Sequence, residues 1–326
     1  MDTIYNDIYR IIFVYLPAAT IIQFRLVSQY LNDLISNGNL DKIVIRSPYY
    51  QNLKHVKNLY FDITLSDTDI IVDSYDNVIS LSPGIKTFTT NENIKKFTNL
   101  TTLFLKSKCN ISTMSLLQLK NLTYLKMYNQ TTIIDQCLSQ LKLVKLNIGG
   151  KTKISNDGIS QMTTLKSLYL HSTEFITNSS IHFLTNLQHI KLNNNNLIDG
   201  IAAQYLTNLT SLKCGKNVSD NHLTLLTNLT SLELYFSDKI HGNFLSILTN
   251  ITKLRIPNFK QIRNTNLKFC TNIRYLNIPC NRNITYDDLK HLTNLTSLQC
   301  QNSKISLDDI QMMTQLKIVN DMPIQL

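Results

Sequence analysis

The sequence predicts an α/β solenoid, in which a short strand and a short helix or turn recur along most of the chain. The stretch 226–234 (LTNLTSLEL) is one copy of a unit that recurs every 20 to 22 residues. Periods of this length are typical of repeat architectures. Because no repeat can bury its apolar side alone, we expect neighbouring repeats to stack and share one continuous core.

The regular repeats, from Leu103 to Leu298, follow the spacing L-x-x-L-x-x-L-x-L, five residues, Ile, four residues, Leu. The two repeats before Leu103 are degenerate, with Pro83 in place of an inward leucine. The alternation in L-x-L predicts a short strand with its leucines pointing into the core, and segments such as 284–289 (ITYDDL) predict a turn into a short helix. The spacing is that of leucine-rich repeats, so we expect a curved parallel sheet inside and short helices or turns outside. The residue that opens L-x-L lies at Leu59, Leu81, Leu103, Leu125, Leu146, Leu168, Ile190, Leu212, Leu232, Leu254, Leu276, Leu298 and Val319.

One repeat is shortened to 20 residues, between Leu212 and Leu232. Its aliphatic residue after L-x-L is Val218, two residues earlier than in the other repeats. We therefore expect the deletion to lie in the turn after the strand, since loops tolerate changes of length.

The first 38 residues do not follow the repeat and predict a small all-α head. Apolar residues at helical spacing end at Leu16-Pro17, a second helical pattern begins at Ile21, and Asn37-Gly38 ends it. Residues 39–58 are predicted to be a linker and N-terminal cap, and residues 59–326 to be the solenoid of about 13 repeats.

The head resembles an F-box. The matching positions are Ile4, Asp7, Ile8, Ile12, Phe13, Tyr15, Leu16, Ile21, Ile22, Phe24, Arg25, Leu26, Val27, Ser28, Leu34 and Ile35. Tyr5 stands where the family has an early proline, and Leu31 where it has tryptophan. The resemblance implies that the head docks the adaptor subunit of a cullin-type ubiquitin ligase through Ile4, Tyr5, Ile8, Phe13, Leu16, Pro17, Ile21, Ile22, Leu26 and Val27.

The repeats from Leu103 onward carry an Ile-Ser/Thr-x-x-x-Leu tail similar to that of F-box/leucine-rich-repeat proteins. This resemblance implies the substrate-recognition subunit of an SCF-like E3 ligase. The alternative is a scaffold or inhibitor in which the N-terminal helices only cap the solenoid.

The middle residue of L-x-L should point outward on the inner, concave face and could bind a partner. Four of these twelve residues are basic, where 32 Lys and Arg in 326 residues would predict about one. The full column is Tyr60, Ser82, Phe104, Lys126, Asn147, Tyr169, Lys191, Lys213, Glu233, Arg255, Asn277 and Gln299. An acidic or phosphorylated protein would relieve the repulsion between these cations, although exposed positions in a Lys-rich protein are often Lys without any such role. The candidate substrate-binding residues are Tyr60, Phe104, Lys126, Tyr169, Lys191, Lys213 and Arg255.

The net charge of +10 leaves a nucleic-acid partner open, but no run of five basic residues supports one. Three of the six cysteines (Cys214, Cys270 and Cys300) replace core leucines, and no C-x-x-C occurs, so we expect neither a metal nor a dithiol site. The cysteine pattern favours a reducing compartment.

Catalysis and membrane insertion find no support in the sequence. The clustered carboxylates Asp287-Asp288 and Asp308-Asp309 fall at predicted helix starts, where negative charge is favourable, and no catalytic motif is present. We therefore expect a non-enzyme without cofactors.

The N-terminus lacks the features of a signal peptide and no stretch of 18 apolar residues occurs, so the sequence predicts a cytoplasmic or nuclear protein. The N-x-S/T sequons, such as Asn228, mostly arise from the repeated T-N-L-T and are poor indicators of glycosylation.

Overall fold

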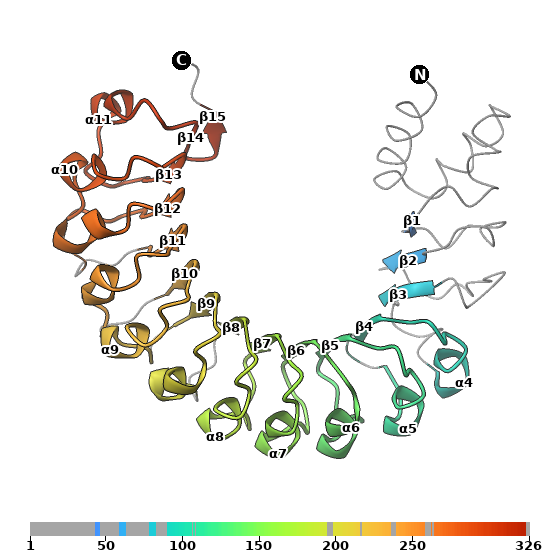
Figure 1. Cartoon of the computed structure of the whole chain (residues 1–326). Helices are drawn as coiled ribbons and strands as arrows, with labels where there is room; N and C mark the ends of the chain where they lie inside the picture. Colours follow the sequence, from blue (N-terminus) through green and yellow to red (C-terminus); the bar gives the residue numbers. More distant parts are fainter. Residues whose placement is uncertain are drawn as a thin grey trace, which may run out of the picture. The chain divides into compact units, whose positions relative to one another are not determined.

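The structure is a computed structural model of the chain (Figure 1). It describes residues 43–45, 59–62, 78–82, 90–105, 107, 109–193, 198–215, 217–235, 239–257, 262 and 264–323. The predicted head, residues 1–38, lies outside the described residues, as does most of the linker. The chain divides into two compact units, residues 1–162 and 163–326, and each is described by itself.

Unit 1 is a parallel sheet with one strand from each repeat. Its strands are β1 (Ile43–Ile45), β2 (Leu59–Asp62), β3 (Val78–Ser82), β4 (Thr102–Leu105), β5 (Tyr124–Tyr128) and β6 (Lys145–Gly149). Its helices are α4 (Asn91–Ile94), α5 (Thr113–Leu116), α6 (Asp135–Gln140) and α7 (Asn156–Ser160). The helices lie on the other side of the core from the sheet (Figure 1).

Unit 2 repeats the same arrangement. Its strands are β7 (Ser167–His171), β8 (His189–Asn193), β9 (Ser211–Cys214), β10 (Ser231–Leu234), β11 (Lys253–Arg255), β12 (Tyr275–Asn277), β13 (Ser297–Gln299), β14 (Ile318–Val319) and β15 (Met322–Pro323). Its helical segments are α8 (Asn178–Ile181), η1 (Gly200–Tyr205), α9 (Asp220–Leu223), η2 (Asn243–Ser246), η3 (Asn264–Phe269), α10 (Tyr286–Leu289) and α11 (Leu307–Met312). Only β15 pairs antiparallel, with β14.

The strand register follows the sequence period. The residue that opens L-x-L in one repeat pairs with its counterpart in the next, as Leu232 does with Leu212 and Leu254. The exception is the pair β2–β3, where the register shifts at a bulge and Leu59 pairs with Val78, while Leu81 pairs with Phe61. From Leu81 to Leu298 the residues that open L-x-L are buried, whereas Val319 in the final hairpin is half-buried. Leu232 and Leu254 are fully buried. Burial of such a side chain stabilises the fold by roughly 1.5–3 kcal/mol. The predicted leucine-rich-repeat solenoid is confirmed.

Most of the α-helical outer segments begin at a Ser or Thr cap, whereas α6 begins at Ile134 without a side-chain cap. Ser112, Ser155, Thr177 and Ser306 accept a hydrogen bond from a backbone N–H of the first turn, which satisfies one donor that the helix leaves free. In η2 the cap is Gly242, with φ 95° and no side chain to accept, and the segment is a 3-10 helix. The short helix predicted for each repeat is therefore present in two forms.

The deletion in the short repeat lies where the sequence predicts it. Asp220 opens α9 six residues after Cys214, the last residue of β9, whereas Asn178 opens α8 eight residues after Leu170, which holds the equivalent position in β7. The strand and helix of the short repeat keep their places, and the turn between them loses two residues.

The asparagine of T-N-L-T and of its variants in other repeats (K-N-L-T, T-N-L-Q, T-N-I-T and T-N-I-R) links neighbouring repeats. Its side-chain amide donates to the carbonyl of the threonine that precedes the equivalent position one repeat earlier, at 2.8–3.2 Å. The asparagines are Asn121, Asn186, Asn208, Asn228, Asn250, Asn272 and Asn294. This shared role gives a structural reason for the recurrence of the sequon-like sequence.

Asp220 forms a second link between repeats. Its carboxylate is 5% exposed and accepts from the backbone N–H groups of His241 (3.0 Å), Gly242 (3.2 Å) and Asn243 (3.3 Å). It thus satisfies the free donors at the start of η2, where Gly242 offers no side chain. Charged acceptors make the stronger hydrogen bonds in proteins.

We predict that Asp220→Ala lowers the free energy of unfolding by about 3 kcal/mol, because several backbone donors lose their acceptor together. Asp157→Ala is the matched control, since Asp157 lies in the first turn of α7 but is exposed. Urea denaturation followed by circular dichroism measures both. Equal effects of the two substitutions would contradict the role given to Asp220.

Candidate functional site

The exposed side of the sheet carries the candidate binding residues. We call it the sheet face: the middle residues of L-x-L and the strand residues two positions before or after them. Side chains alternate along a strand, so these residues point away from the buried leucines. Phe104 and Lys126 contribute to the sheet face of unit 1, and Tyr169, Lys191, Lys213 and Arg255 to that of unit 2. Tyr60 is in β2, where the structure describes the backbone only.

In unit 1, aromatic rings and lysines are interleaved on β4, β5 and β6. Phe104 and Tyr124 meet edge to face with ring centroids 5.2 Å apart. The Lys126 ammonium lies 5.4 Å from the centroid of Phe104, and that of Lys145 lies 4.2 Å from the centroid of Tyr124. Cation–π contacts at exposed sites contribute about 0.5–1 kcal/mol, so each ring helps to hold a cation on this surface.

The same pairing recurs in unit 2. The Lys191 ammonium lies 4.8 Å from the ring centroid of Tyr169, and that of Lys253 lies 5.2 Å from the centroid of Tyr275. In each pair the aromatic residue and the lysine are register partners on adjacent strands. The pairing is therefore a direct consequence of the repeat register.

Glu233 forms ion pairs with two of the candidate binding residues, Lys213 and Arg255. Its Oε1 lies 3.2 Å from Lys213 Nζ and 3.0 Å from Arg255 Nη1, on the strands at either side. Tyr235 donates its hydroxyl hydrogen to Glu233 and accepts a hydrogen bond from Lys213 Nζ at 2.9 Å. We call Lys213, Glu233, Tyr235 and Arg255 the Glu233 cluster; its formal charges, two positive and one negative, leave a net +1.

The exposed part of the sheet face ends within β12, where Tyr275 still pairs with Lys253 but Asn277 is buried. Asn277 and Gln299 were predicted to point outward, and they occupy the middle position of L-x-L in register with each other, but they are only 9% and 3% exposed. Gln299 donates to Asp321 at 2.8 Å, which lies in the turn between β14 and β15, so the final hairpin covers it. Asn277 donates to the hydroxyl of Tyr275 at 3.3 Å.

The Glu233 cluster was not predicted from the sequence, because the middle residues of L-x-L were considered one by one and contacts between neighbouring strands were not. Glu233 was recognised as outward-facing, but its contacts with both neighbours were not foreseen. Tyr235 comes directly after L-x-L, and continuing the alternation by one more step would have placed it on the sheet face. The head residues predicted to dock an adaptor lie outside the described residues and stay predictions.

The described residues offer no metal site of three or more His, Cys, Asp or Glu side chains. Asp288 and Asp309 instead complete capping boxes with Thr285 and Ser306, as their position at helix starts suggests. Asp287 forms an exposed ion pair with Lys290 at 2.7 Å. No helix in the described part of the chain has the length and hydrophobicity needed to cross a bilayer.

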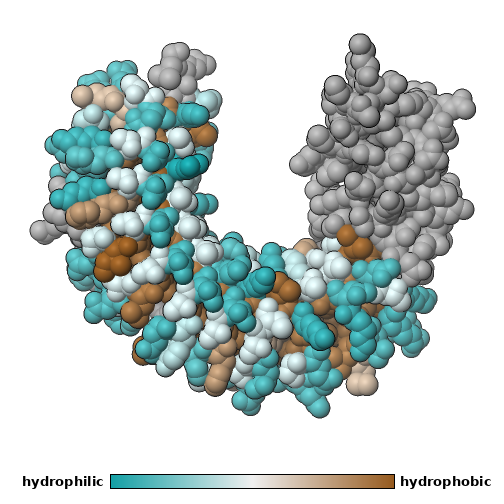
Figure 2. Space-filling view, viewed as in Figure 1, coloured by the Kyte–Doolittle hydropathy of each residue, from teal (hydrophilic) through white to brown (hydrophobic). Residues whose placement is uncertain are grey.

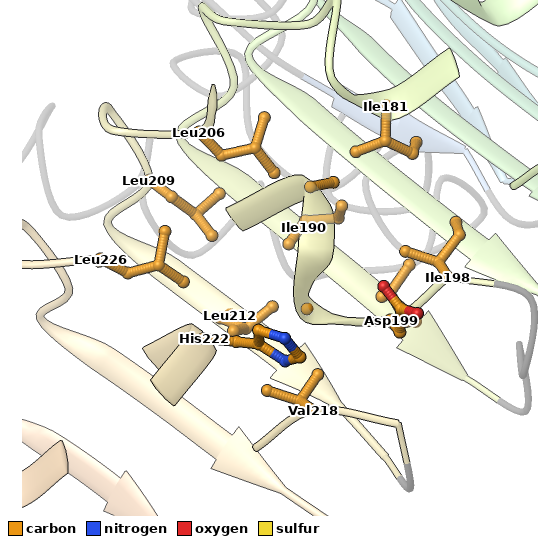
Figure 3. Close-up of a pocket in the computed structure, with 13 residues that line it drawn as sticks. Ile181, Ile190, Ile198, Asp199, Leu206, Leu209, Leu212, Val218, His222 and Leu226 are labelled. Atoms are coloured by element: carbon orange, nitrogen blue, oxygen red, sulfur yellow. The ribbon is translucent and has the colours of Figure 1, made fainter. Parts of the chain in front are cut away.

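An apolar cavity lies in the core between the repeats of β8 and β9 (Figure 3). Its volume is about 30 Å³, and its lining includes Ile190, Leu206 and Leu212, with Asp199 and His222 also contributing. A space of this size holds at most about two water molecules. The cavity is therefore a packing gap and too small for an organic ligand.

Five of the six cysteines are buried and only Cys280 is exposed; none forms a disulfide. Burial raises the pKa of Cys214 and of Cys270 to about 12. It also raises the pKa of Cys137 to about 11, against a smaller lowering by the Thr113 carbonyl. These thiols stay protonated and serve as small core side chains, as the sequence predicts for Cys214 and Cys270.

We predict that Glu233→Gln lowers the free energy of unfolding by about 1–2 kcal/mol, because Lys213 and Arg255 then lie close together without a carboxylate between them. The loss stays moderate because the charged side chains are partly exposed to solvent. The loss should become smaller at high salt. The control Glu92→Gln removes an exposed pair with Lys95 and should have no measurable effect. Denaturation at two salt concentrations tests this, and a loss that does not depend on salt would contradict the electrostatic account.

We predict that the protein loses stability above pH 9 in part through its buried thiols. The unfolded Cys214 thiol ionises near pH 9.0, whereas the native thiol stays protonated to about pH 12, so the unfolded state is favoured as the pH rises between these values. Because Cys214→Val has no thiol to ionise at this position, its free energy of unfolding at pH 10 should fall by about 1 kcal/mol less than that of the wild-type protein. Cys280→Ser should show the full decline. Identical pH profiles for all three proteins would contradict the prediction.

No family model matches the sequence, and no curated protein is similar to it in sequence. The structure is similar to an internalin (inlF) of Listeria monocytogenes, with TM-score 0.59, 22% identity, and 91% of this chain and 90% of that chain covered. A leucine-rich-repeat protein of Leptospira interrogans gives TM-score 0.53 and 17% identity over 86% and 90%.

Two receptors are similar over part of their own length. Toll from Drosophila, in complex with Spatzle, gives TM-score 0.54 and 15% identity over 86% of this chain and 44% of that chain. TLR13, in complex with ssRNA13, gives TM-score 0.52 and 18% identity over 87% and 47%. At these identities the likeness concerns the fold alone. It agrees with the strand register and burial described above: the chain has the leucine-rich-repeat fold.

Proposed function

We propose that the chain binds a protein substrate through the sheet face, as the substrate-recognition subunit of a cullin-type ubiquitin ligase. The observation that carries the binding role is the repeated pairing of an aromatic ring with a cation on adjacent strands. Aromatic and cationic side chains dominate the energetically important centres of protein interfaces. The fold supports this role, because stacked repeats present an extended surface for binding.

The proposed partner is acidic or phosphorylated where it meets Lys126 and Lys191. Each of these lysines lies over an aromatic ring, and neither has an ion pair with a carboxylate among the described residues. Lys213 and Arg255 share Glu233, so an acidic group would compete there with a carboxylate already in place. Of the four basic candidates, Lys126 and Lys191 should therefore contribute most to binding.

The ligase role rests on the F-box resemblance of residues 1–38. In this proposal Ile4, Ile8, Leu16, Pro17 and the other matching residues dock the adaptor, while the repeats hold the substrate. The alternative is a scaffold or inhibitor in which the head only caps the repeats. A nucleic-acid partner is a further alternative, since the similar receptor TLR13 was solved in complex with ssRNA13.

We predict that the full chain co-purifies with the adaptor subunit of a cullin ligase. A full-length variant with Ile8→Asp and Leu26→Asp should lose the adaptor, because charged residues then occupy the apolar docking positions. Gln29→Asp, outside the matching positions, is the control and should retain it. Failure of the wild-type chain to bind any cullin adaptor would remove the ligase role and leave the scaffold alternative.

The substrate side needs a test of its own. Binding of acidic and phosphorylated peptides should fall at least tenfold with Lys191→Glu. It should not fall with Lys290→Glu, an equal charge change at the exposed residue that directly follows the outer helix α10. A tenfold loss corresponds to about 1.4 kcal/mol. Equal loss in both variants would mean that only net charge matters. Tight binding of single-stranded RNA with a steep salt dependence would favour the nucleic-acid alternative.

A further inference from the structure

The outer side of unit 2 carries an apolar stripe that the sheet face does not use. In five consecutive repeats a large hydrophobic residue stands directly before the sequence L-T-N-L or its variants. The leucine that opens this sequence is replaced by Cys270 in the last of the five repeats. These residues, here called the outer stripe, are Phe183, Tyr205, Leu225, Ile247 and Phe269. They are 51%, 46%, 49%, 48% and 45% exposed. Half of each side chain is thus left in contact with solvent.

The fold itself does not require an apolar residue at this position. The equivalent residues in the preceding repeats are Gln118, Gln140 and Gln161, and the repeat after Phe269 has His291. The same strand, turn and helix form in those repeats. The outer stripe is therefore a local feature of unit 2, superimposed on a repeat that accepts glutamine.

The stripe residues occupy equivalent places in space. Each lies at or within two residues of the end of its helical segment, from α8 to η3. His182 contacts two of them, with ring centroids 3.9 Å from Phe183 and 5.4 Å from Tyr205. Figure 2 shows patches of hydrophobic colour along the outer side of this part of unit 2.

The stripe supplies a large part of the apolar area that association requires. Its five half-exposed side chains present on the order of 450 Å², more than half of the roughly 800 Å² that each partner buries in a stable interface. Each stripe residue is two positions before an uncharged Thr-Asn pair, at 185–186, 207–208, 227–228, 249–250 and 271–272. One cation lies at the end of the stripe, where the Lys268 ammonium is 5.1 Å from the ring centroid of Phe269. Two copies of a chain with net charge +10 therefore meet with little like-charge repulsion near Leu225, and each copy brings one lysine to an end of the interface.

The order of residues along the stripe is close to symmetric about Leu225. An aromatic residue stands at each end, Phe183 and Phe269, and Tyr205 and Ile247 flank the centre. A two-fold interface must be complementary to itself. When two stripes run antiparallel, Leu225 meets Leu225, Phe183 meets Phe269, and Tyr205 meets Ile247, so every apolar residue has an apolar partner.

We propose that the outer stripe of unit 2 is a homodimer interface, in which two copies of the chain pair antiparallel about a two-fold axis at Leu225. The proposal concerns a surface on the opposite side of the core from the sheet face. It stands independently of the ligase role. A dimer formed in this way would present two sheet faces to its partners.

Sedimentation velocity of the full chain tests the proposal. The wild-type protein at micromolar concentration should have twice the mass of a single chain. Leu225→Glu and Leu225→Lys should each be monomeric, because two like charges meet at the axis. An equimolar mixture of these two variants should form a dimer again, because the charges are then opposite. Gln118→Glu, at the equivalent position in unit 1, is the control and should remain dimeric.

The outcomes that overturn the proposal are distinct. A wild-type chain that stays monomeric at 100-fold higher concentration excludes the dimer. A Leu225→Glu variant that remains dimeric places the interface elsewhere, and a mixture of the two variants that stays monomeric excludes the axis at Leu225. Because the wild-type mass alone can refute the dimer, the test does not depend on the folding of the variants.

Discussion

The structure depends on one constraint: a single repeat of 20 to 22 residues has leucines on one side and nothing within itself to cover them. Leu232 is fully buried because the strands of Leu212 and Leu254 lie on either side of it. The stacking also aligns polar groups, so that asparagine amides and the Asp220 carboxylate reach the backbone of the adjacent repeat. Hydrophobic burial and these links therefore act between the same neighbours.

This constraint also shapes the sheet face. Because the leucines fix which side of each strand points inward, the residues between them form columns with one member per strand. Rings and cations then become neighbours through register alone, as Tyr169 and Lys191 do. Where an acidic residue enters the column, as at Glu233, it neutralises part of the positive charge of the strands beside it. The chemistry of the surface can thus vary from repeat to repeat while the core stays the same.

Much of the fold could be predicted from the sequence, because spacing alone decides which residues are buried. The period gave the strand register, and the early position of Val218 located the deletion in the turn. The choice between α and 3-10 helix was not predicted, and the cap alone does not explain it: η2 begins at Gly242 without a side-chain cap, and so does the α-helix α6 at Ile134. The burial of Gln299 was also missed, since it depends on a hairpin that lies beyond the last regular repeat.

The candidate site was less accessible from sequence. The columns of Phe104, Lys126 and Tyr169 follow from alternation, but the sharing of one carboxylate by Lys213 and Arg255 depends on side-chain conformations that spacing does not determine. The role of the head depends on residues 1–38, which lie outside the described residues, so only its resemblance supports it.

Amide hydrogen exchange along the intact chain tests the central claim most directly, namely that stacking of the repeats holds the L-x-L strands together in register. The account predicts slow exchange that recurs with the sequence period at strand amides bonded to a neighbouring repeat, such as those of Lys253, Tyr275 and Ser297. The exposed outer segments should exchange faster. Protection that does not recur with this period, or that is absent from the L-x-L strands, would contradict the account.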